Sequence, residues 1–536
     1  MFSRKDIVVL GMMIFALFLG AGNIIFPPME GYTAGQHWAI AALGFVLTGV
    51  LMPFITLVVV SVLGRGEELT CDLPKWAEVL FLATLYLVIG STFAMPRITN
   101  VAYEMALVPL EIVADTSANH LIFAVAFNII AMLFMLKPNT IISSVGKFMT
   151  PALLVLLVVV TAAVFISPLS EISAPSKAYA EGSVLTTGLI SGYQTMDVLA
   201  AIAFGGIVAR ALSSKNVTEP HKIMRYTIFA GCISVVLLAA LYFSLFYLGA
   251  TSDAVAQGAN NGGQIFSRYV GVLFGKEGSL IMSGIIFLAS LTTLVGVTSA
   301  CAYYFAKFSN RLPYSFWVVF FTIMTTIISE NGLTKLLQVT IPALLLIYPV
   351  AIMLVVLQMV RAKLPWVKLT YNATIIITVC FSLCDSLNNV RLLPQGIKQL
   401  LGNFPLYDNG LAWLIPALSV IVLTILVGKI TKNNERIFSL KKFIQKSNNL
   451  LPVLRQNFII CEILISRRET LKNLSEEESD ILFIGAKQTS VNFLNVVDMS
   501  PDCDDQDTLL ILAGHVVPIC HTGTESCFRH LPHEPN

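Results

Sequence analysis

One aspartate stands alone in a long apolar run, where a carboxylate could bind a cation, an ammonium group or a proton. Asp197 is the 16th of the 28 residues between Glu181 and Arg210, and no other charged residue lies between them. A carboxylate at membrane depth is costly and marks a candidate functional site, although a hydrogen-bonded contact between two helices is the simpler alternative. The residues before it add a flexible point and hydrogen-bonding groups. Gly192, Gln194 and Thr195 therefore join Asp197 as candidate site residues.

A second polar interruption lies in the first apolar run of the chain. Gly20, Ala21, Gly22 and Asn23 follow Phe18-Leu19, and a double proline at 27–28 closes the run. Glycine weakens a helix by about 1 kcal/mol relative to alanine, and an asparagine in hydrocarbon needs hydrogen-bonding partners. We therefore predict that the helix unwinds near residues 20–22 and exposes backbone groups. A small-residue packing face that ends at the prolines is the alternative.

A third feature is a group of hydroxyls in a later apolar run. Five serines and threonines lie within residues 290–299. Hydroxyl oxygens can bind a hard cation, but they also bond to the carbonyl four residues back without any functional role. Thr292 and Thr293 lie nearest the middle of the run, and we predict that these two bind an ion.

The elements that position these residues are membrane helices. Of the 536 residues, 56% are hydrophobic and only 12% are charged, which is about half the charged share of a soluble globular protein. Residues 1–430 hold 23 Lys/Arg and 18 Asp/Glu, whereas the last 106 residues hold 11 and 14. This pattern excludes a soluble or nucleic-acid-binding body and predicts a membrane domain over 1–430, followed by a polar cytoplasmic tail over 431–536.

A spanning helix requires about 20 mostly apolar residues, and we count twelve candidates. They are 7–26, 38–63, 77–96, 120–136, 148–167, 184–208, 226–249, 279–305, 314–330, 336–360, 369–385 and 411–430. Backbone groups in hydrocarbon must be satisfied internally, which predicts an all-α polytopic fold.

The positive charges in the connections predict the orientation. With a cytoplasmic N-terminus, the inside segments carry 15 Lys/Arg and the outside segments carry 7. The outside set is Arg97, Lys177, Arg268, Lys276, Lys335, Arg391 and Lys398. Because positive residues favour the cytoplasmic side, both termini are predicted to be cytoplasmic.

The two polar interruptions fall at corresponding places, in the first and sixth spans, each of which opens a block of five. Interrupted helices at matching positions of two halves are typical of an inverted-repeat transporter with a binding site near the midplane. Half-helix N-termini favour a carboxylate, and unwound carbonyls favour a small cation. An amino acid with a coupling cation fits both.

The segments FALFLGAGNIIFPP, GYQTMD and LTTLVGVTSACAYYFAKF resemble the bacterial branched-chain amino acid:cation symporters of the amino acid–polyamine–organocation superfamily. The resemblance covers about residues 1–430. It implies uptake of leucine, isoleucine and valine, driven by Na⁺ or H⁺ without another cofactor, across a bacterial inner membrane. It also implies a five-plus-five inverted repeat of the leucine-transporter type, with the last two helices peripheral.

By the same resemblance, residues 20–23 are the unwound part of the first helix and 192–197 that of the sixth. The substrate carboxylate would face Gly20, Ala21 and Gly22. The substrate's ammonium group and side chain would lie nearest Gly192, Tyr193, Gln194, Thr195 and Asp197. The ion would be bound by Gly20, Asn23, Thr292 and Thr293. A carrier of another small neutral amino acid, an exchanger and, with less support, a channel stay open. Nothing in the body suggests a catalytic set, so we expect a protein that is not an enzyme.

The tail departs from this family. It carries a cluster of cysteines and histidines whose spacing matches no standard zinc pattern: Cys503, His515, Cys520, His521, Cys527, His530 and His533. A small appended domain, an extension without a fold of its own and a shifted reading frame stay open.

Overall fold

A computed structural model describes residues 3–112, 114–136, 154–155, 157–308, 311–402, 404, 406–407, 410–449, 508–512 and 515–519. Most of the predicted Cys/His cluster of the tail and the start of the predicted span 148–167 lie outside the described residues. The chain divides into two compact units, Met1–Glu435 and Arg436–Asn536.

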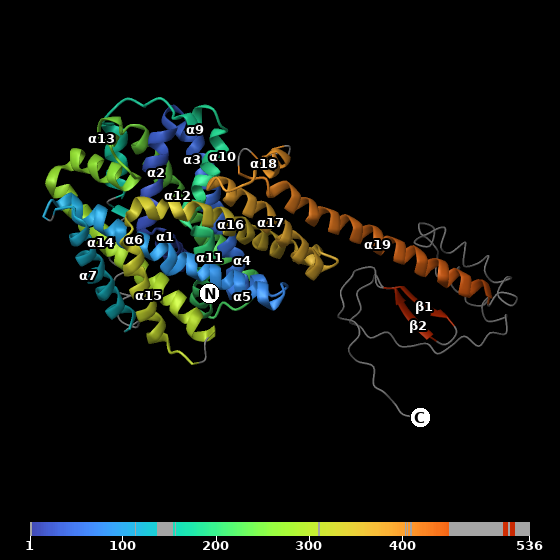
Figure 1. Cartoon of the computed structure of the whole chain (residues 1–536). Helices are drawn as coiled ribbons and strands as arrows, with labels where there is room; N and C mark the ends of the chain where they lie inside the picture. Colours follow the sequence, from blue (N-terminus) through green and yellow to red (C-terminus); the bar gives the residue numbers. More distant parts are fainter. Residues whose placement is uncertain are drawn as a thin grey trace. The chain divides into compact units, whose positions relative to one another are not determined.

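Helices make up nearly all of the first unit (Figure 1). The α-helices are α1 Arg4–Phe18, α2 Ala21–Ala34, α3 Trp38–Val46, α4 Met52–Leu63, α5 Lys75–Leu87, α6 Ala94–Ala102, α7 Ser117–Met135, α9 Lys177–Ala180, α10 Val184–Ser191, α11 Asp197–Ser213, α12 Pro220–Ala250, α13 Asp253–Ala256, α14 Gly262–Phe308, α15 Tyr314–Ser329, α16 Gly332–Val360, α17 Val367–Asn389, α18 Gln395–Leu401 and α19 Leu414–Asn449. Short 3₁₀ or π segments are η1 Gly35–His37, η2 Leu47–Leu51, η3 Gly66–Thr70, η4 Val88–Thr92, η5 Tyr103–Leu107, η6 Val108–Leu110, η7 Gly192–Thr195 and η8 Arg361–Lys363.

Among the described residues, eight helical runs are long and apolar enough to cross a membrane, or nine when the bent pair α10–η7 and α11 counts as one span. Shorter apolar helices cover Leu157–Ile166 and Tyr314–Ser329. Together with the broken first helix, these runs fall on all twelve predicted ranges. The chain is therefore a polytopic helical membrane protein.

Two boundaries differ from the prediction. The double proline does not close the first span, because Pro27 and Pro28 lie inside α2, which continues to Ala34. The predicted span 77–96 is part of a longer helical run, Lys75–Leu110. Arg97, which we expected in an outside connection, lies inside that run and is only 4% exposed.

The third span contains a break that the sequence did not predict. The π-helical segment η4 contains Gly90 at φ −92° and ψ −136°, and Phe93 is also non-helical at φ −133° and ψ −55°. Pro96 follows and lacks the N–H that would bond to the carbonyl of residue 92. The chain changes direction here, before α6 begins.

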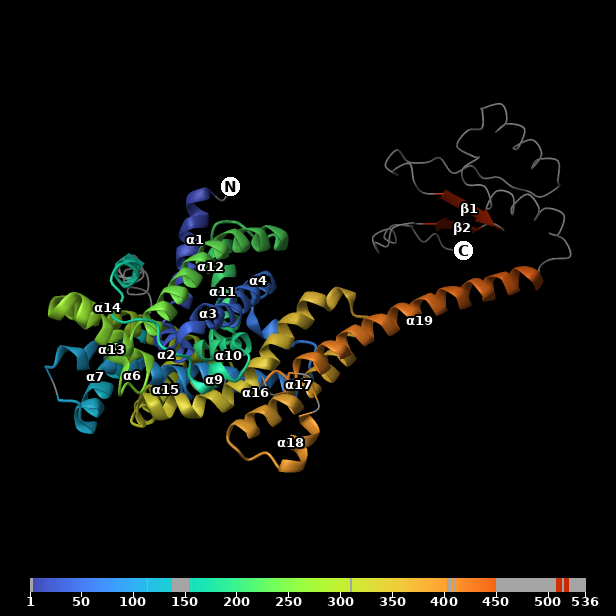
Figure 2. The same ribbon diagram turned by 90° about the horizontal axis from the view of Figure 1, so that it is seen from above.

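Among the described residues, the apolar core consists of two large clusters and a small third one, formed by Leu401, Tyr407 and Ala412. The first large cluster is built mainly from α4, α5, α6, α11, α14 and α16, and the second mainly from α1, α2, α3, α12 and α14. The break in the first span is flanked by Phe18 and Ile24, which belong to the second cluster. The break in the sixth span is flanked by Tyr193 and Val198, which belong to the first cluster. Figures 1 and 2 show α16 and α17 side by side, in agreement with their extensive packing.

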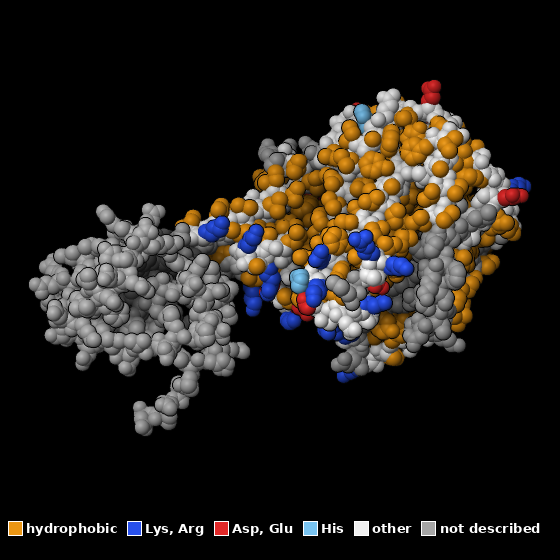
Figure 3. Space-filling view, turned by 180° about the vertical axis from the view of Figure 1, so that it is seen from behind, with side chains coloured by type: hydrophobic (Ala, Val, Ile, Leu, Met, Phe, Trp, Pro, Cys, Tyr) orange, Lys and Arg blue, Asp and Glu red, His pale blue; other side chains and the backbone are white. Residues whose placement is uncertain are grey.

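The outer surface of this unit is apolar. Figure 3 shows a face covered largely by hydrophobic side chains, with Lys and Arg gathered in one zone. Large apolar side chains such as Ile122, Val236 and Ile376 are more than 60% exposed. Such an apolar surface is unfavourable in contact with water but favourable in contact with lipid.

Ion pairs join several connections at one end of the helices. Lys307 at the end of α14 pairs with Glu67 at 2.7 Å, and Arg361 after α16 pairs with Asp72 at 2.7 Å. The segment 64–74 and the ends of α14 and α16 therefore share one end of the bundle. The predicted orientation requires this, because it assigns all three to the same side.

The second unit contains two described strands, β1 Thr508–Leu512 and β2 His515–Ile519. They pair antiparallel, with Leu510 opposite Val517.

Candidate functional site

The first span is interrupted between α1 and α2. Leu19 has φ −76° and ψ 80°, and Gly20 is extended at φ −91° and ψ 162°. The unwound part is thus residues 19–20, which is shorter than the predicted 20–23. Ala21, Gly22 and Asn23 form the first turn of α2, where backbone N–H groups lack partners within the helix.

The side chain of Asn23 closes this break and links it to two other helices. Its Nδ2 donates to the Phe18 carbonyl at 2.7 Å, to Asp197 Oδ2 at 2.8 Å and to the Tyr242 hydroxyl at 2.9 Å. An amide has only two N–H groups for these three acceptors. Oxygens from α1, α11 and α12 therefore converge on one nitrogen position.

The sixth span is interrupted between α10 and α11. The 3₁₀ segment η7 covers Gly192–Thr195, and Met196 has a left-handed backbone at φ 62°. The two helices meet at 48°. Asp197 is the first residue of α11, so its buried carboxylate lies at the positive end of a helix. A break occurs where one was predicted, but it is shorter than the predicted 192–197, because Gly192–Thr195 are 3₁₀-helical and Asp197 already belongs to α11.

The residues of η7 hold this break against its neighbours. Tyr193 stacks on Tyr348 of α16 with ring centroids 4.4 Å apart, and the Tyr348 hydroxyl accepts from the Val198 N–H at 3.2 Å. Thr195 Oγ1 donates to the Gly192 carbonyl at 2.9 Å. Gly192 must be glycine, because a Cβ there would lie 2.0 Å from Thr48 Oγ1.

One of the two predicted threonines lies at the first break. A Cβ on Gly20 would lie 3.4 Å from Thr293 Cγ2 and 3.9 Å from its Oγ1. The Thr293 and Thr292 hydroxyls both donate to the Ala289 carbonyl, at 2.8 and 2.9 Å. The described contacts bring Thr293 to the break but not Thr292. The roles of both residues in ion binding stay predictions.

Sequence reasoning missed Arg97. Its Nη1 donates to the Gln194 carbonyl at 2.7 Å, and its guanidinium lies over the Phe26 ring, 5.2 Å from the centroid. A Cβ on Gly22 would lie 2.9 Å from Arg97 Nη2, so only glycine lets the guanidinium approach α2. Arg97 therefore joins the two helix breaks.

Sequence reasoning also missed Tyr242, whose hydroxyl accepts from Asn23, and Tyr348, whose hydroxyl accepts from the Val198 N–H. A tyrosine in an apolar run gives a weak signal, because most such residues simply pack.

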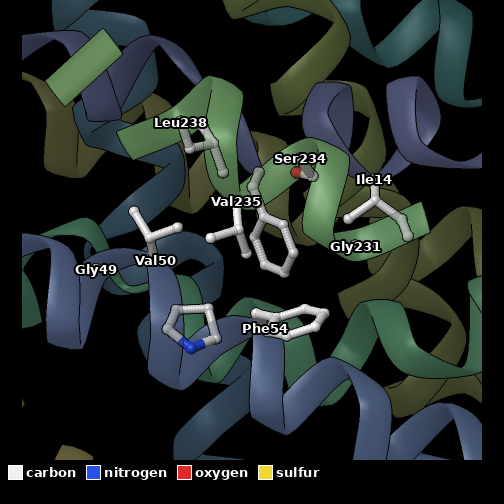
Figure 4. A pocket seen from close by; sticks show the side chains of 10 residues that line it. Ile14, Gly49, Val50, Phe54, Gly231, Ser234, Val235 and Leu238 are labelled. Atoms are coloured by element: carbon white, nitrogen blue, oxygen red, sulfur yellow. The ribbon is translucent and has the colours of Figure 1, made fainter. Parts of the chain in front are cut away.

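A separate hollow lies between α1, η2, α4 and α12 (Figure 4). It is apolar except for the Ser234 hydroxyl, which has no hydrogen-bond partner among the described residues. It shares Phe18 with the break but none of the polar contacts of Asn23, Asp197 or Arg97. Its lining is Ile14, Phe18, Gly49, Val50, Pro53, Phe54, Gly231, Ser234, Val235 and Leu238.

Within the described residues, no group of three or more His, Cys, Asp or Glu side chains could hold a metal ion. The polar centre is instead a set of neutral oxygens, amides and two charges, enclosed by apolar side chains. Such a set suits the reversible binding of a small polar solute rather than covalent chemistry.

Comparison with known proteins agrees with this geometry. A family described as "Branched-chain amino acid transport protein" matches residues 3–431. A second family, described as "Phosphoribosyl-AMP cyclohydrolase", matches residues 485–529 of the tail, which our sequence analysis did not recognise.

Curated relatives cover the same part of the chain. The branched-chain amino acid permease BrnQ of Haemophilus influenzae is 71% identical over 429 residues, which are 80% of this chain and 98% of the relative. The branched-chain amino acid transport system 2 carrier protein of Pseudomonas aeruginosa is 37% identical, over 79% of this chain and 96% of the relative.

Among solved structures, MHP1, a nucleobase-cation-symport-1 family transporter in a closed conformation with bromovinylhydantoin bound, matches with a TM-score of 0.51. It is 12% identical and covers 80% of this chain and 93% of its own. This likeness shows the fold, which is that of the leucine-transporter type. Because the relatives are permeases and carriers, the expectation of a transporter rather than an enzyme is confirmed. The chain belongs to the branched-chain amino acid transport protein family.

Proposed function

We propose that this protein imports leucine, isoleucine and valine together with Na⁺ or H⁺ by alternating access. The substrate class follows the names of the relatives, which are branched-chain amino acid permeases and carriers. Symport with a cation is supported by one observation above all, the convergence of three oxygens on Asn23 Nδ2 within 2.7–2.9 Å.

The convergence supports a cation site for two reasons. The Phe18 carbonyl ends a half-helix, and such carbonyls coordinate Na⁺ in transporters with broken helices. The Asp197 carboxylate adds the negative charge that a buried cation needs. If the Asn23 amide turned over, its own oxygen would join the set, and Thr293 lies beside the same break.

The substrate site we propose lies between the two breaks. The N-terminus of α2 is the positive end of a helix and therefore favours a carboxylate. A branched aliphatic pocket discriminates by only about 1–3 kcal/mol per methylene, so the three substrates should compete with one another. We place the protein in a bacterial inner membrane with both termini cytoplasmic.

Uptake into proteoliposomes tests this function. Radiolabelled leucine is offered with an inward Na⁺ gradient while an ionophore equilibrates protons, and then with an inward proton gradient in Na⁺-free buffer. Accumulation with one gradient, reduced by excess isoleucine and valine, supports the symporter and identifies its ion. Uptake only into vesicles preloaded with amino acid would indicate an exchanger, and alanine outcompeting leucine would indicate another neutral amino acid.

A further inference from the structure

Arg97 is a buried cation whose charge the described residues leave unpaired. Its side chain is enclosed, with the residue 4% exposed, yet no described carboxylate lies within the 4.0 Å of an ion pair. Nη1 bonds to a neutral carbonyl, that of Gln194, and Nε has no hydrogen-bond partner among the described residues. A buried charge in this state is unfavourable unless a partner binds it for part of the protein's cycle.

The negative charge at this centre, that of Asp197, is also buried and also bonds to a neutral group. Asp197 is 4% exposed, and its Oδ2 accepts from a neutral amide, that of Asn23. The positive and negative groups thus share one buried centre without lying within the 4.0 Å of an ion pair. A ligand that carries an ammonium group and a carboxylate on one carbon atom can offer a partner to each of these two charges.

Arg97 also has the geometry to receive an anion. Guanidinium N–H groups form a planar fork that matches a carboxylate in a bidentate way. The fork lies against Gly22 in the first turn of α2, where helix N–H groups also favour an anion. The Phe26 ring and the Gln194 carbonyl both contact the guanidinium and restrict its position.

We propose that Arg97 binds the α-carboxylate of the transported amino acid, so that the substrate's carboxylate completes the pairing that the side chain lacks. This inference rests on the proposed function, and it adds a specificity-determining residue from the third span to a site formed by the breaks in the first and sixth. The competing explanation is a structural one, in which Arg97 only ties α6 to η7 through Gln194.

The two explanations differ in what happens to a ligand without a carboxylate. Purified full-length protein is titrated with leucine and with leucinamide, which keeps the ammonium and the side chain but not the carboxylate. We expect the wild type to prefer leucine by on the order of 100-fold, because a site built to hold a charged group rejects an analogue that leaves it unpaired. In Arg97→Gln we expect that preference to fall below about 10-fold, mainly through weaker leucine binding.

Arg225→Gln is the matched control. Arg225 also places its guanidinium over a phenylalanine ring, that of Phe229 at 5.7 Å, but it is exposed on α12. This variant should keep the wild-type preference. Arg97→Lys retains a charge without the fork, and we expect a preference between those of the wild type and Arg97→Gln.

The outcomes separate the proposals. A wild type that binds leucine and leucinamide equally, or an Arg97→Gln or Arg97→Lys variant that keeps the full preference, overturns the role of Arg97. Equal loss of both ligands in Arg97→Lys would also overturn it, in favour of a structural tie. If Arg97→Gln does not fold, the wild-type ratio and the Arg97→Lys ratio decide the question. A wild type that neither binds nor accumulates leucine would instead remove the proposed function.

Discussion

Replacing Asp197 by asparagine should separate transport from folding. The substitution keeps the size of the side chain but removes the charge from an oxygen that accepts from Asn23 Nδ2 at 2.8 Å. For a cation about 4 Å from this carboxylate, an effective dielectric of about 20 gives an attraction of about 4 kcal/mol. Loss of that attraction weakens cation binding about 1000-fold.

The effect on stability should be small, because two contributions oppose each other. A hydrogen bond to a charged acceptor contributes about 1.5–3 kcal/mol and a neutral one about 1 kcal/mol, so asparagine loses about 0.5–2 kcal/mol. The neutral side chain also avoids the unfavourable burial of a charge, which is of similar or larger size. We therefore expect the melting temperature in detergent to change by only a few degrees.

The assay compares concentrative leucine uptake in proteoliposomes with the melting temperature of the same preparation. We expect Asp197→Asn to accumulate no leucine while it remains folded. Asp253→Asn makes the same chemical change at an exposed position and should behave like the wild type. Near-normal accumulation by a well-folded Asp197→Asn protein would show that the carboxylate does not bind the coupling ion.

Three further outcomes are expected. Asp385 in α17 is 6% exposed, and its Oδ2 has no hydrogen-bond partner among the described residues. Asp385→Asn should therefore raise the melting temperature in detergent, and an unchanged or lower melting temperature would contradict this. Burial and the neighbouring carboxylate of Asp72 raise the pKa of the Cys71 thiol, so an impermeant maleimide should label a variant with Cys71 as its only cysteine faster as the pH rises. Labelling in inverted vesicles but not in intact cells would support the cytoplasmic placement of residues 64–74, and the reverse would contradict it. Ending the chain after Asn449 should leave leucine uptake unchanged, because the 429 residues shared with the Haemophilus permease cover 98% of that relative. Loss of uptake at equal abundance in the membrane would show that the tail has a role in transport.

The two helix breaks could be predicted because their residues are unusual in a membrane helix. Glycines with an asparagine, and an isolated aspartate, are costly at membrane depth, and the sequence alone shows that cost. The first break was located less accurately: we predicted unwinding near residues 20–22, whereas the structure unwinds residues 19–20. Gly20 is extended and starts a new helix, so Ala21–Asn23 return to helical geometry immediately. Local composition indicates where a helix is weak, but tertiary contacts decide at which peptide it opens.

The third break and Arg97 could not be predicted for a related reason. Gly90 resembles any small packing residue in the sequence, and its non-helical geometry depends on neighbours such as Cys301, whose Sγ would lie 3.2 Å from a Cβ at this position. Arg97 follows Met95-Pro96 at the end of an apolar run, which is the usual place for a charge in a connection. Only the three-dimensional course of the chain shows that the helical run continues and buries the guanidinium.

The location of the polar centre between the two apolar clusters has a mechanical consequence. Contacts inside each cluster are dense and apolar, and packed interiors do not deform continuously. Relative motion is therefore easiest at the boundary between the clusters, where Asn23 of α2 reaches across to Asp197 of α11 through a hydrogen bond and Arg97 of α6 lies over the Phe26 ring of α2. A few polar bonds can exchange partners with little change in the number formed. We therefore expect cation binding to act on this boundary, because the cation would replace the Asn23–Asp197 contact that now joins the two clusters.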